Sequence, residues 1–226
     1  MKLICCGTGS SGNTYLLTDG KETLVLDCGM PFKDAKIALG FNVRGIQAAL
    51  VTHKHLDHAK YIHEYEAAGI PVIKSYEAPN LREHFQLGGF QVFSFPVVHN
   101  VPCVGYMVKH KDFGKLLYVT DAEYLRYRFD GLSVMLIEAN YSTEYANKLE
   151  AKYRHVLTGH MSIETCVDAI RANASEKLNH VVLIHLSDGN SNESAFREAV
   201  EAIVPAGCTV DVAGKGLTVD LNDVPF

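Results

Sequence analysis

The run His53-Lys54-His55-Leu56-Asp57-His58 places four side chains that can bind a transition metal within six residues. It follows the apolar segment Ala48–Val51, which predicts a strand, and a strand that ends in a tight turn lets several side chains converge on one point. A mixed set of imidazole and carboxylate ligands suits Zn, Mn or Fe, so the ligand types do not determine which of these metals binds. The alternative is a polar surface turn that is rich in histidine by chance. Four candidate ligands in one short run make this alternative a poor explanation. The sequence therefore predicts a metal centre at this turn.

The same run matches the H-x-H-x-D-H signature of the metallo-β-lactamase superfamily, and further motifs resemble that family in the same order. The segments "GTGSSGN" (Gly7–Asn13) and "LVLDCG" (Leu24–Gly29) resemble its opening strands. His99 in "FPVVHN" resembles the third histidine motif, Asp121 in "LLYVTDA" the metal-bridging aspartate, and His185 in "VVLIHLSDGN" the last histidine. The resemblance covers nearly the whole chain.

The resemblance implies a pair of divalent transition-metal ions, Zn or Mn, held by seven ligands. The implied ligands are His53, His55 and His99 for one ion, Asp57, His58 and His185 for the other, and Asp121 as the bridge. Two ions ~3.5–4 Å apart lower the pKa of a shared water, so a bridging hydroxide can attack near neutral pH. Asp27 is expected to orient a ligand histidine and not to bind metal itself.

Two further motifs narrow the reaction. "LIEAN" (Leu136–Asn140) resembles the glutamate-bearing strand end of ribonuclease Z, and "GHMSIETCVDAI" (Gly159–Ile170) resembles its histidine motif and the "GHLS" motif of YycJ-type proteins. In that comparison His160 donates a proton to the leaving oxygen, and Glu138 orients it. The alternative is a helix capped by Ser162 and preceded by an incidental histidine. The predicted catalytic residues are Asp57, Glu138 and His160.

The YycJ-type branch is the closest overall resemblance, because the chain also has "GSSGN" and "HLSDGNSN" (His185–Asn192). The chain lacks the long arm of ribonuclease Z, and the interval from Asp121 to His185 is too short for the inserted domain of ribonuclease J. The expected function is a metal-dependent phosphodiesterase, above all a nuclease acting on DNA or RNA. A cyclic-nucleotide phosphodiesterase, completed by a second subunit in a homodimer, stays an alternative, as does a thioester or glyoxalase-type hydrolase.

The elements that must position these residues are short apolar strands punctuated by Gly, Asn and Asp. Several of them end at or just before a site residue, for example Leu116–Thr120, Val134–Glu138 and Val181–His185. Antiparallel-looking strand pairs come first, and strands that alternate with helices follow. This order favours one α/β domain over residues 1–226, a four-layer αββα sandwich as in the metallo-β-lactamase fold. The predicted helices are Ala59–Ala68, Glu77–His84, Glu144–Ala151, Ile163–Ala172 and Glu193–Ile203.

Composition restricts the setting of this chemistry. The net charge of −5 argues against a protein that coats polyanions, but not against a nucleic-acid enzyme, because bound divalent metals reverse the local field. The six cysteines have neither metal nor redox spacing and are expected in the core. With no signal-like start and no apolar run of membrane-spanning length, the sequence predicts a cytoplasmic protein that has no membrane partner.

Overall fold

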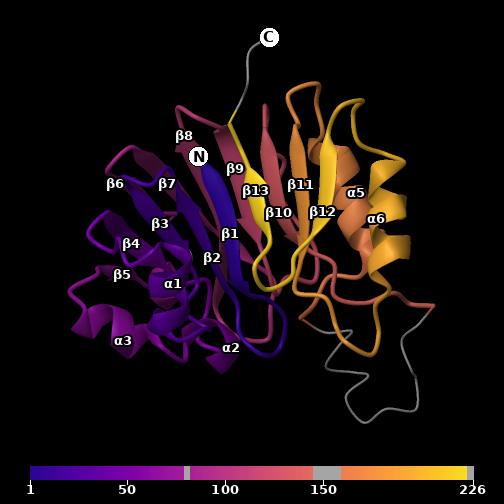
Figure 1. Ribbon diagram of the computed structural model, residues 1–226. Helices are drawn as coiled ribbons and strands as arrows, with labels where there is room; N and C mark the ends of the chain where they lie inside the picture. Colours follow the sequence, from indigo (N-terminus) through magenta and orange to yellow (C-terminus); the bar gives the residue numbers. More distant parts are fainter. Residues whose placement is uncertain (79–81, 145–158, 223–226) are drawn as a thin grey trace.

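Two β-sheets packed face to face form the centre of the protein in the computed structural model, which describes residues 1–78, 82–144 and 159–222 (Figure 1). The first sheet has the strand order β13-β1-β2-β3-β4-β5. Strands β1, β2 and β3 form antiparallel pairs, as the sequence predicts, and β4 and β5 are added in parallel. The strands of this sheet are β1 (Lys2–Gly7), β2 (Thr14–Thr18), β3 (Thr23–Leu26), β4 (Ile46–Leu50), β5 (Val72–Ile73) and β13 (Thr218–Asp220).

The second sheet has the order β12-β11-β10-β9-β8-β7-β6. Strands β9 to β12 are parallel, whereas β6 to β9 are successive antiparallel neighbours. The carboxyl ends of β7, β9, β10 and β11 therefore lie at the same edge of the sheet. The strands are β6 (His84–Leu87), β7 (Phe90–Val97), β8 (Cys103–His110), β9 (Gly114–Val119), β10 (Val134–Glu138), β11 (His180–Ile184) and β12 (Thr209–Val212).

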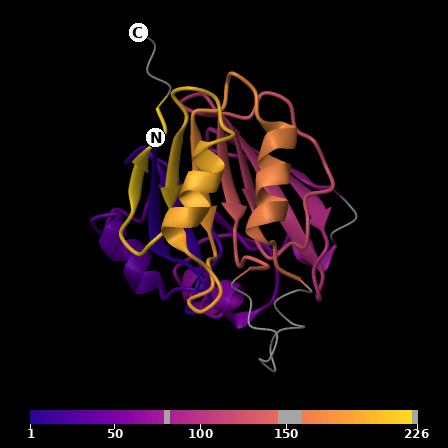
Figure 2. The ribbon, with the colours of Figure 1, turned by 90° about the vertical axis from the view of Figure 1, so that its right-hand side faces the viewer.

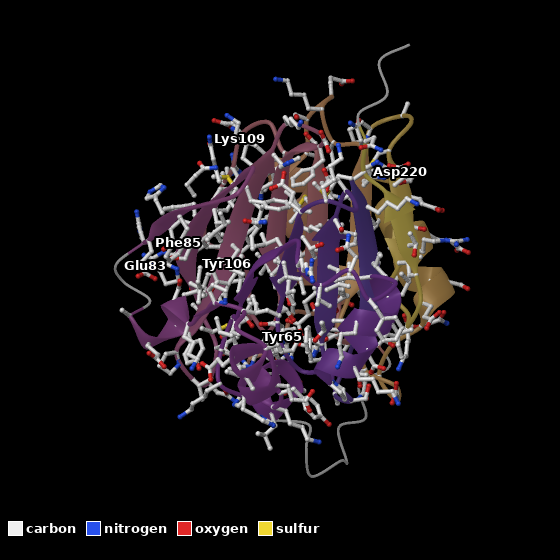
Figure 3. All side chains as sticks on the ribbon, turned by 60° about the vertical axis from the view of Figure 1, so that its left-hand side comes forward. Tyr65, Glu83, Phe85, Tyr106, Lys109 and Asp220 are labelled. Carbon is white, nitrogen blue, oxygen red and sulfur yellow. The ribbon has the colours of Figure 1, made fainter. Side chains whose placement is uncertain are left out.

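Three apolar clusters separate four layers. One fills the space between the sheets and includes Tyr106, which points inward in Figure 3. A second lies between the second sheet and the helices α5 (Ile163–Asn173) and α6 (Glu193–Glu201), which lie side by side on its outer face in Figure 2. The third lies between the first sheet and the helices α1 (Phe32–Ala38) and α3 (Ile62–Ala67). The predicted αββα sandwich is confirmed.

The two long helices begin where their capping residues predict. The Ser162 hydroxyl accepts the N–H of Thr165 at 3.2 Å, and the Asn192 side chain accepts the N–H of Ala195 at 3.2 Å. These bonds satisfy amide donors that have no partner in the first turn of a helix. Both helices then bury one apolar face against the second sheet, and their bounds agree with the predicted ones to within two residues.

The predicted helix Glu77–His84 is wrong. Among the described residues of this interval, Glu77 ends a single 3-10 turn (η1, Ser75–Glu77), and His84 begins β6. Strand β6 pairs with β7 in a hairpin, with Leu87 opposite Phe90. The physical reason is the sequence "HFQLGGFQVF", in which alternating residues flank a two-residue Gly-Gly turn, a strong hairpin signal.

Smaller differences concern the helices near the first sheet. The predicted helix Ala59–Ala68 is two short ones, α2 (Leu56–Ala59) and α3, and α1 was not predicted. The predicted helix Glu144–Ala151 lies outside the described residues from position 145 onward. Five of the six cysteines are buried, as expected, but Cys208 is only partly so. Within the described ranges, no helix has the length and apolar character that crossing a membrane requires.

Candidate metal centre

The histidine run His53–His58 begins at a fixed point between the two sheets. Val51 and Thr52 follow β4 and are fully buried. The Tyr106 hydroxyl, from β8 of the other sheet, donates to the Val51 carbonyl at 2.9 Å. The Thr52 amide donates to Asp27 Oδ1 at 2.7 Å. The buried strand and these two bonds fix where the run starts, and α2, at the lower end of the molecule in Figure 1, then turns the chain.

Three imidazoles converge on one side of the site. His53 Nε2 lies 3.0 Å and His99 Nε2 lies 3.2 Å from the Nδ1 atom of His55. The Gly159 carbonyl accepts the Nδ1–H of His99 at 2.7 Å, which leaves a lone pair on Nε2 of the neutral ring. Burial lowers the pKa of His53 to about 2 and also lowers the pKa of His99, which favours the neutral form of both rings. Neutral imidazoles with converging nitrogens fit a transition-metal ion.

Two carboxylates and two imidazoles meet beside this group. Asp57 Oδ2 lies 3.4 Å from His58 Nε2 and 3.3 Å from His185 Nε2. Asp121 Oδ2 lies 2.9 Å from His58 Nε2 and 3.6 Å from His185 Nε2. Asp121 also groups with His53, so it lies between the two sets, where a bridging ligand would be needed. The structure brings all seven predicted ligands together, and their binding of metal stays a prediction.

The charges of this second group fit a divalent cation. Burial opposes a charged ring, but Asp121 and Asp27 outweigh it and raise the pKa of His58. Asp121 and Asp57 likewise raise the pKa of His185 to about 10 against its burial. The pKa of Asp57 lies below its usual range, because hydrogen bonds from His185 and His58 outweigh the effect of burial. A divalent cation held among these groups would supply the positive charge that the carboxylates favour.

Asp27 contacts His58, a predicted ligand, as expected. Its carboxylate does not belong to any of the groups of side chains that could hold a metal ion. His58 Nδ1 lies 2.7 Å from Asp27 Oδ2, and the Tyr118 hydroxyl donates to the same oxygen. The Thr52 hydroxyl donates to Asp27 Oδ1 at 3.0 Å. Because an ionised carboxylate only accepts, Nδ1 of His58 carries a proton and its Nε2 faces the other ligands. This contact supports the predicted orienting role of Asp27.

Three residues of the site have left-handed backbone conformations that are uncommon outside glycine. They are Asp27 with φ 61°, Asp121 with φ 50° and His185 with φ 57°. Each lies within two residues of a strand end, after β3, β9 and β11 respectively. The left-handed residue turns the chain sharply as it leaves the sheet, at the point where the side chain joins the cluster.

The predicted acid and its partner lie against the ligand cluster. Glu138, at the end of β10, is fully buried, and its Oε1 lies 2.8 Å from His160 Nδ1 and 3.3 Å from His185 Nδ1. Glu138 Oε2 accepts the N–H groups of Ala122 at 3.1 Å and Met161 at 3.2 Å. The His160 ring stacks on His185 with centroids 5.4 Å apart and planes at 16°. Burial opposes a charged ring, but Glu138 outweighs it and raises the pKa of His160.

Three polar side chains without a predicted role also contact the cluster. The Thr8 hydroxyl accepts the N–H of His185 at 3.0 Å, and the Asn140 side chain donates to the His185 carbonyl at 2.8 Å. Asn13 Nδ2 lies 3.0 Å from His58 Nε2. All three belong to motifs that carry the family resemblance, "GTGSSGN" and "LIEAN". Their place in these motifs could have marked the three residues as site residues from the sequence. Only the fold shows which predicted ligand each of them contacts.

Comparison with known proteins finds a family model and curated proteins that are similar to this chain. The sequence model of the metallo-β-lactamase superfamily matches residues 7–73, which include the histidine run. The exodeoxyribonuclease YycJ of Bacillus anthracis is 26% identical over 236 residues, covering 87% of this chain and 86% of that protein. The exodeoxyribonuclease WalJ of Streptococcus pneumoniae serotype 2 is 27% identical over 243 residues, covering 92% and 90%.

A solved structure shows the same fold. The metallo-β-lactamase fold protein YhfI from Bacillus subtilis superposes with a TM-score of 0.71 and covers 96% of this chain and 98% of that chain. The two sequences are 16% identical, so this likeness concerns the fold. The fold class and the superfamily resemblance predicted from the sequence are both confirmed.

Proposed function

We propose that this chain, which has the metallo-β-lactamase fold, is a metal-dependent phosphodiesterase that acts as a nuclease on DNA or RNA. The observation that carries the proposal is the contact of His160 with the buried Glu138, directly beside the ligand cluster. Hydrolysis of a thioester does not need a positioned imidazolium for its leaving group, whereas release of a nucleotide alkoxide does. The names of the relatives, exodeoxyribonucleases that match over most of both chains, support the same class of substrate.

The proposal includes two metal ions, Zn or Mn, in the two ligand groups described above. When bound, they would polarise the phosphate and lower the pKa of a water between them. We further propose one domain over residues 1–226, since the ligands come from both sheets. A cytoplasmic location is part of the proposal, because all six cysteines are free thiols, which a reducing compartment preserves.

In this proposal His160 protonates the leaving oxygen. Its Nδ1 faces Glu138 at 2.8 Å, and stacking against His185 holds the ring plane beside the ligand cluster. Glu138 raises the pKa of His160 against the effect of burial, and this shift favours the protonated ring that a general acid requires. Glu138 is held in turn by the amides of Ala122 and Met161. These hydrogen bonds position Glu138, and Glu138 in turn orients the His160 ring.

The leaving group provides the test. With Mn- or Zn-loaded protein, His160→Ala should reduce cleavage of a single-stranded DNA or RNA oligonucleotide by ~10²–10⁴-fold, the usual contribution of a positioned general acid. The same variant should lose much less activity on bis(p-nitrophenyl) phosphate, because p-nitrophenolate leaves without a proton. His63→Ala, at an exposed histidine of α3, is the matched control and should leave both activities unchanged.

The alternatives give different results. Equal losses on both substrates would mean that His160 supports the ligands and is not an acid. Activity on cyclic nucleotides with none on oligonucleotides would favour the cyclic-nucleotide reading. A wild-type protein that hydrolyses a thioester and no phosphodiester would overturn the proposal.

A further inference from the structure

We infer that an apolar rim beside the metal centre, formed by Leu56, Val98 and Tyr124, receives an unpaired nucleobase of the substrate, and that Tyr124 stacks on it. The inference rests on the proposed function and names its substrate more closely. It makes single-stranded nucleic acid the preferred substrate, because the bases of a duplex are already stacked and paired. Tyr124 would be a residue that determines specificity and not one that takes part in bond cleavage.

The first observation is where exposed apolar side chains occur. Leu56 is 71% exposed, Tyr124 45% and Val98 37%. Within the described ranges only two other large hydrophobic residues are as exposed, Ile37 and Phe41, both near the end of α1. Large apolar side chains on a protein surface mark binding sites when they gather at one place.

The second observation is that the rim residues lie close to proposed ligands along the chain. Leu56 lies between His55 and Asp57 in the chain, and Val98 directly precedes His99. His55 Nδ1 and His99 Nε2 are 3.2 Å apart, so Leu56 and Val98 are chain neighbours of two imidazoles that meet. Three segments that are distant in sequence, after β4, β7 and β9, therefore each bring an exposed apolar residue to the metal centre.

Tyr124 is tied to the same place by the backbone. The N–H of Glu123 donates to the Val98 carbonyl at 2.9 Å, so Tyr124 lies next to Val98. It is also three residues after Asp121, the proposed bridging ligand. The backbone beside Tyr124 is thus tied to the segment that carries His99, and the residue is nearly half exposed.

The chemistry of the rim fits a base and not a phosphate. A phosphate favours cations and N–H donors, whereas leucine, valine and an exposed tyrosine offer flat or apolar contact area. Every nucleobase has a π-face that can stack on an aromatic ring, whatever its hydrogen-bonding edge. With the phosphodiester at the metal centre, the adjoining base is the part of the substrate that can reach the rim. The expected preference is therefore for unpaired bases with little selectivity among them.

The experiment removes the ring from the protein and the base from the substrate. Steady-state kinetics would compare wild type, Tyr124→Ala and Tyr124→Phe on a single-stranded DNA oligonucleotide and on an abasic oligomer of the same length. On the oligonucleotide, Tyr124→Ala should raise KM by about 10- to 100-fold with little change in kcat, the loss expected for one stacked base. Tyr124→Phe keeps the ring and should behave like wild type. On the abasic oligomer, Tyr124→Ala should match wild type.

Phe41→Ala is the control, because Phe41 is an exposed aromatic residue, 71% accessible, that lies outside the rim. It should leave KM unchanged on both substrates. Equal losses for Tyr124→Ala on the oligonucleotide and the abasic oligomer would overturn the inference, since the ring would then act on the fold. An unchanged KM on the oligonucleotide would also overturn it, with the phosphodiesterase activity intact. If wild type cleaves neither substrate, the proposed function itself fails.

Discussion

Asp27 connects the interior of the protein to His58, one of the proposed metal ligands. It accepts hydrogen bonds from Thr52 of the chain leaving β4 and from Tyr118 of β9, which belong to different sheets. Its carboxylate also lies 2.7 Å from His58 Nδ1. A carboxylate held from both sheets therefore fixes the rotation of the His58 ring and raises the electron density on Nε2.

Replacing Asp27 by asparagine tests this role. The Asp27→Asn side chain keeps the shape of the carboxyl group but removes its charge and one acceptor, so it no longer requires a proton on His58 Nδ1. Metal affinity should fall by about 10- to 100-fold, as for other groups that hold a metal-bound histidine. Titration of the metal-free protein with Zn or Mn measures this. Asp168→Asn, at an exposed residue of α5, is the control.

An unchanged affinity for Asp27→Asn would mean that Tyr118, Thr52 and the packing around the ring suffice to orient His58. The orienting role assigned to Asp27 would then be wrong, while the ligand assignment of His58 would be untouched.

At the scale of elements, the position of α2 depends on close contact with the loop after β3. A Cβ atom added at Gly29 would lie 1.8 Å from the Asp57 carbonyl oxygen and 2.5 Å from the Asn13 nitrogen. Both neighbours are backbone atoms that hydrogen-bond to each other at 2.7 Å. The helix that carries Asp57 and His58 can therefore reach the other ligands only because residue 29 has no side chain.

Gly29→Ala should displace α2 and weaken both folding and metal binding. The expected loss is about 3 kcal/mol of unfolding free energy or more, at the upper end for overpacking because backbone must move. Thermal unfolding and elemental analysis measure the two effects. Gly214→Ala is the control, since no atom lies within 4 Å of a Cβ at that exposed position. A Gly29→Ala protein with normal melting temperature and normal metal content would contradict the account.

The sequence predicted the strands better than the short helices, for a physical reason. Runs such as Val134–Glu138 are buried along their whole length, so their apolar, β-branched residues are unambiguous. By contrast, α1 and α2 are short and are held by contacts with the first sheet and its loops, which leave little periodicity in the sequence. The first strand of the β6–β7 hairpin was not predicted, because the expected helix Glu77–His84 overlaps its start.

Site residues that belong to a recognisable motif could be predicted from the sequence. Site residues that are identified only by a contact in the fold could not. The histidine run was recognisable from its composition, and the other ligands were predicted from the resemblance to the metallo-β-lactamase superfamily. The supporting bond from the His185 amide to Thr8 joins residues 177 positions apart, and no local pattern indicates it. The same holds for the apolar rim, whose members look unremarkable in sequence and are notable only because they are exposed beside the ligands.

At the scale of the whole molecule, the proposed ligands join the two sheets. The histidine run follows β4 of the first sheet, whereas His99, Asp121 and His185 follow β7, β9 and β11 of the second. Bound metal would therefore cross-link the two halves of the sandwich at one edge. A ligand that binds only the folded state stabilises it by an amount set by its concentration relative to Kd.

Metal loading should accordingly raise the melting temperature. At a free metal concentration of 100 times Kd, the gain is about 2.7 kcal/mol, or roughly 5–10 °C for a chain of this size. Differential scanning calorimetry with and without a chelator measures it. His53→Ala should show a smaller gain because it lacks one ligand. An equal melting temperature with and without metal would contradict a cross-linking centre.

The left-handed conformations of Asp27, Asp121 and His185 have a consequence for engineering. An L-residue in this conformation costs roughly 1–2 kcal/mol relative to the right-handed one, and glycine avoids most of that cost. Two of the proposed ligands, Asp121 and His185, therefore have backbone conformations that cost stability. In metal-free medium, glycine at Asp121 or His185 would remove this backbone cost together with a proposed ligand, so selection for thermal stability alone favours loss of the site. Screens for thermally stabilised variants of this protein should therefore measure enzymatic activity in every round. Otherwise the most stable variants selected would be inactive ones.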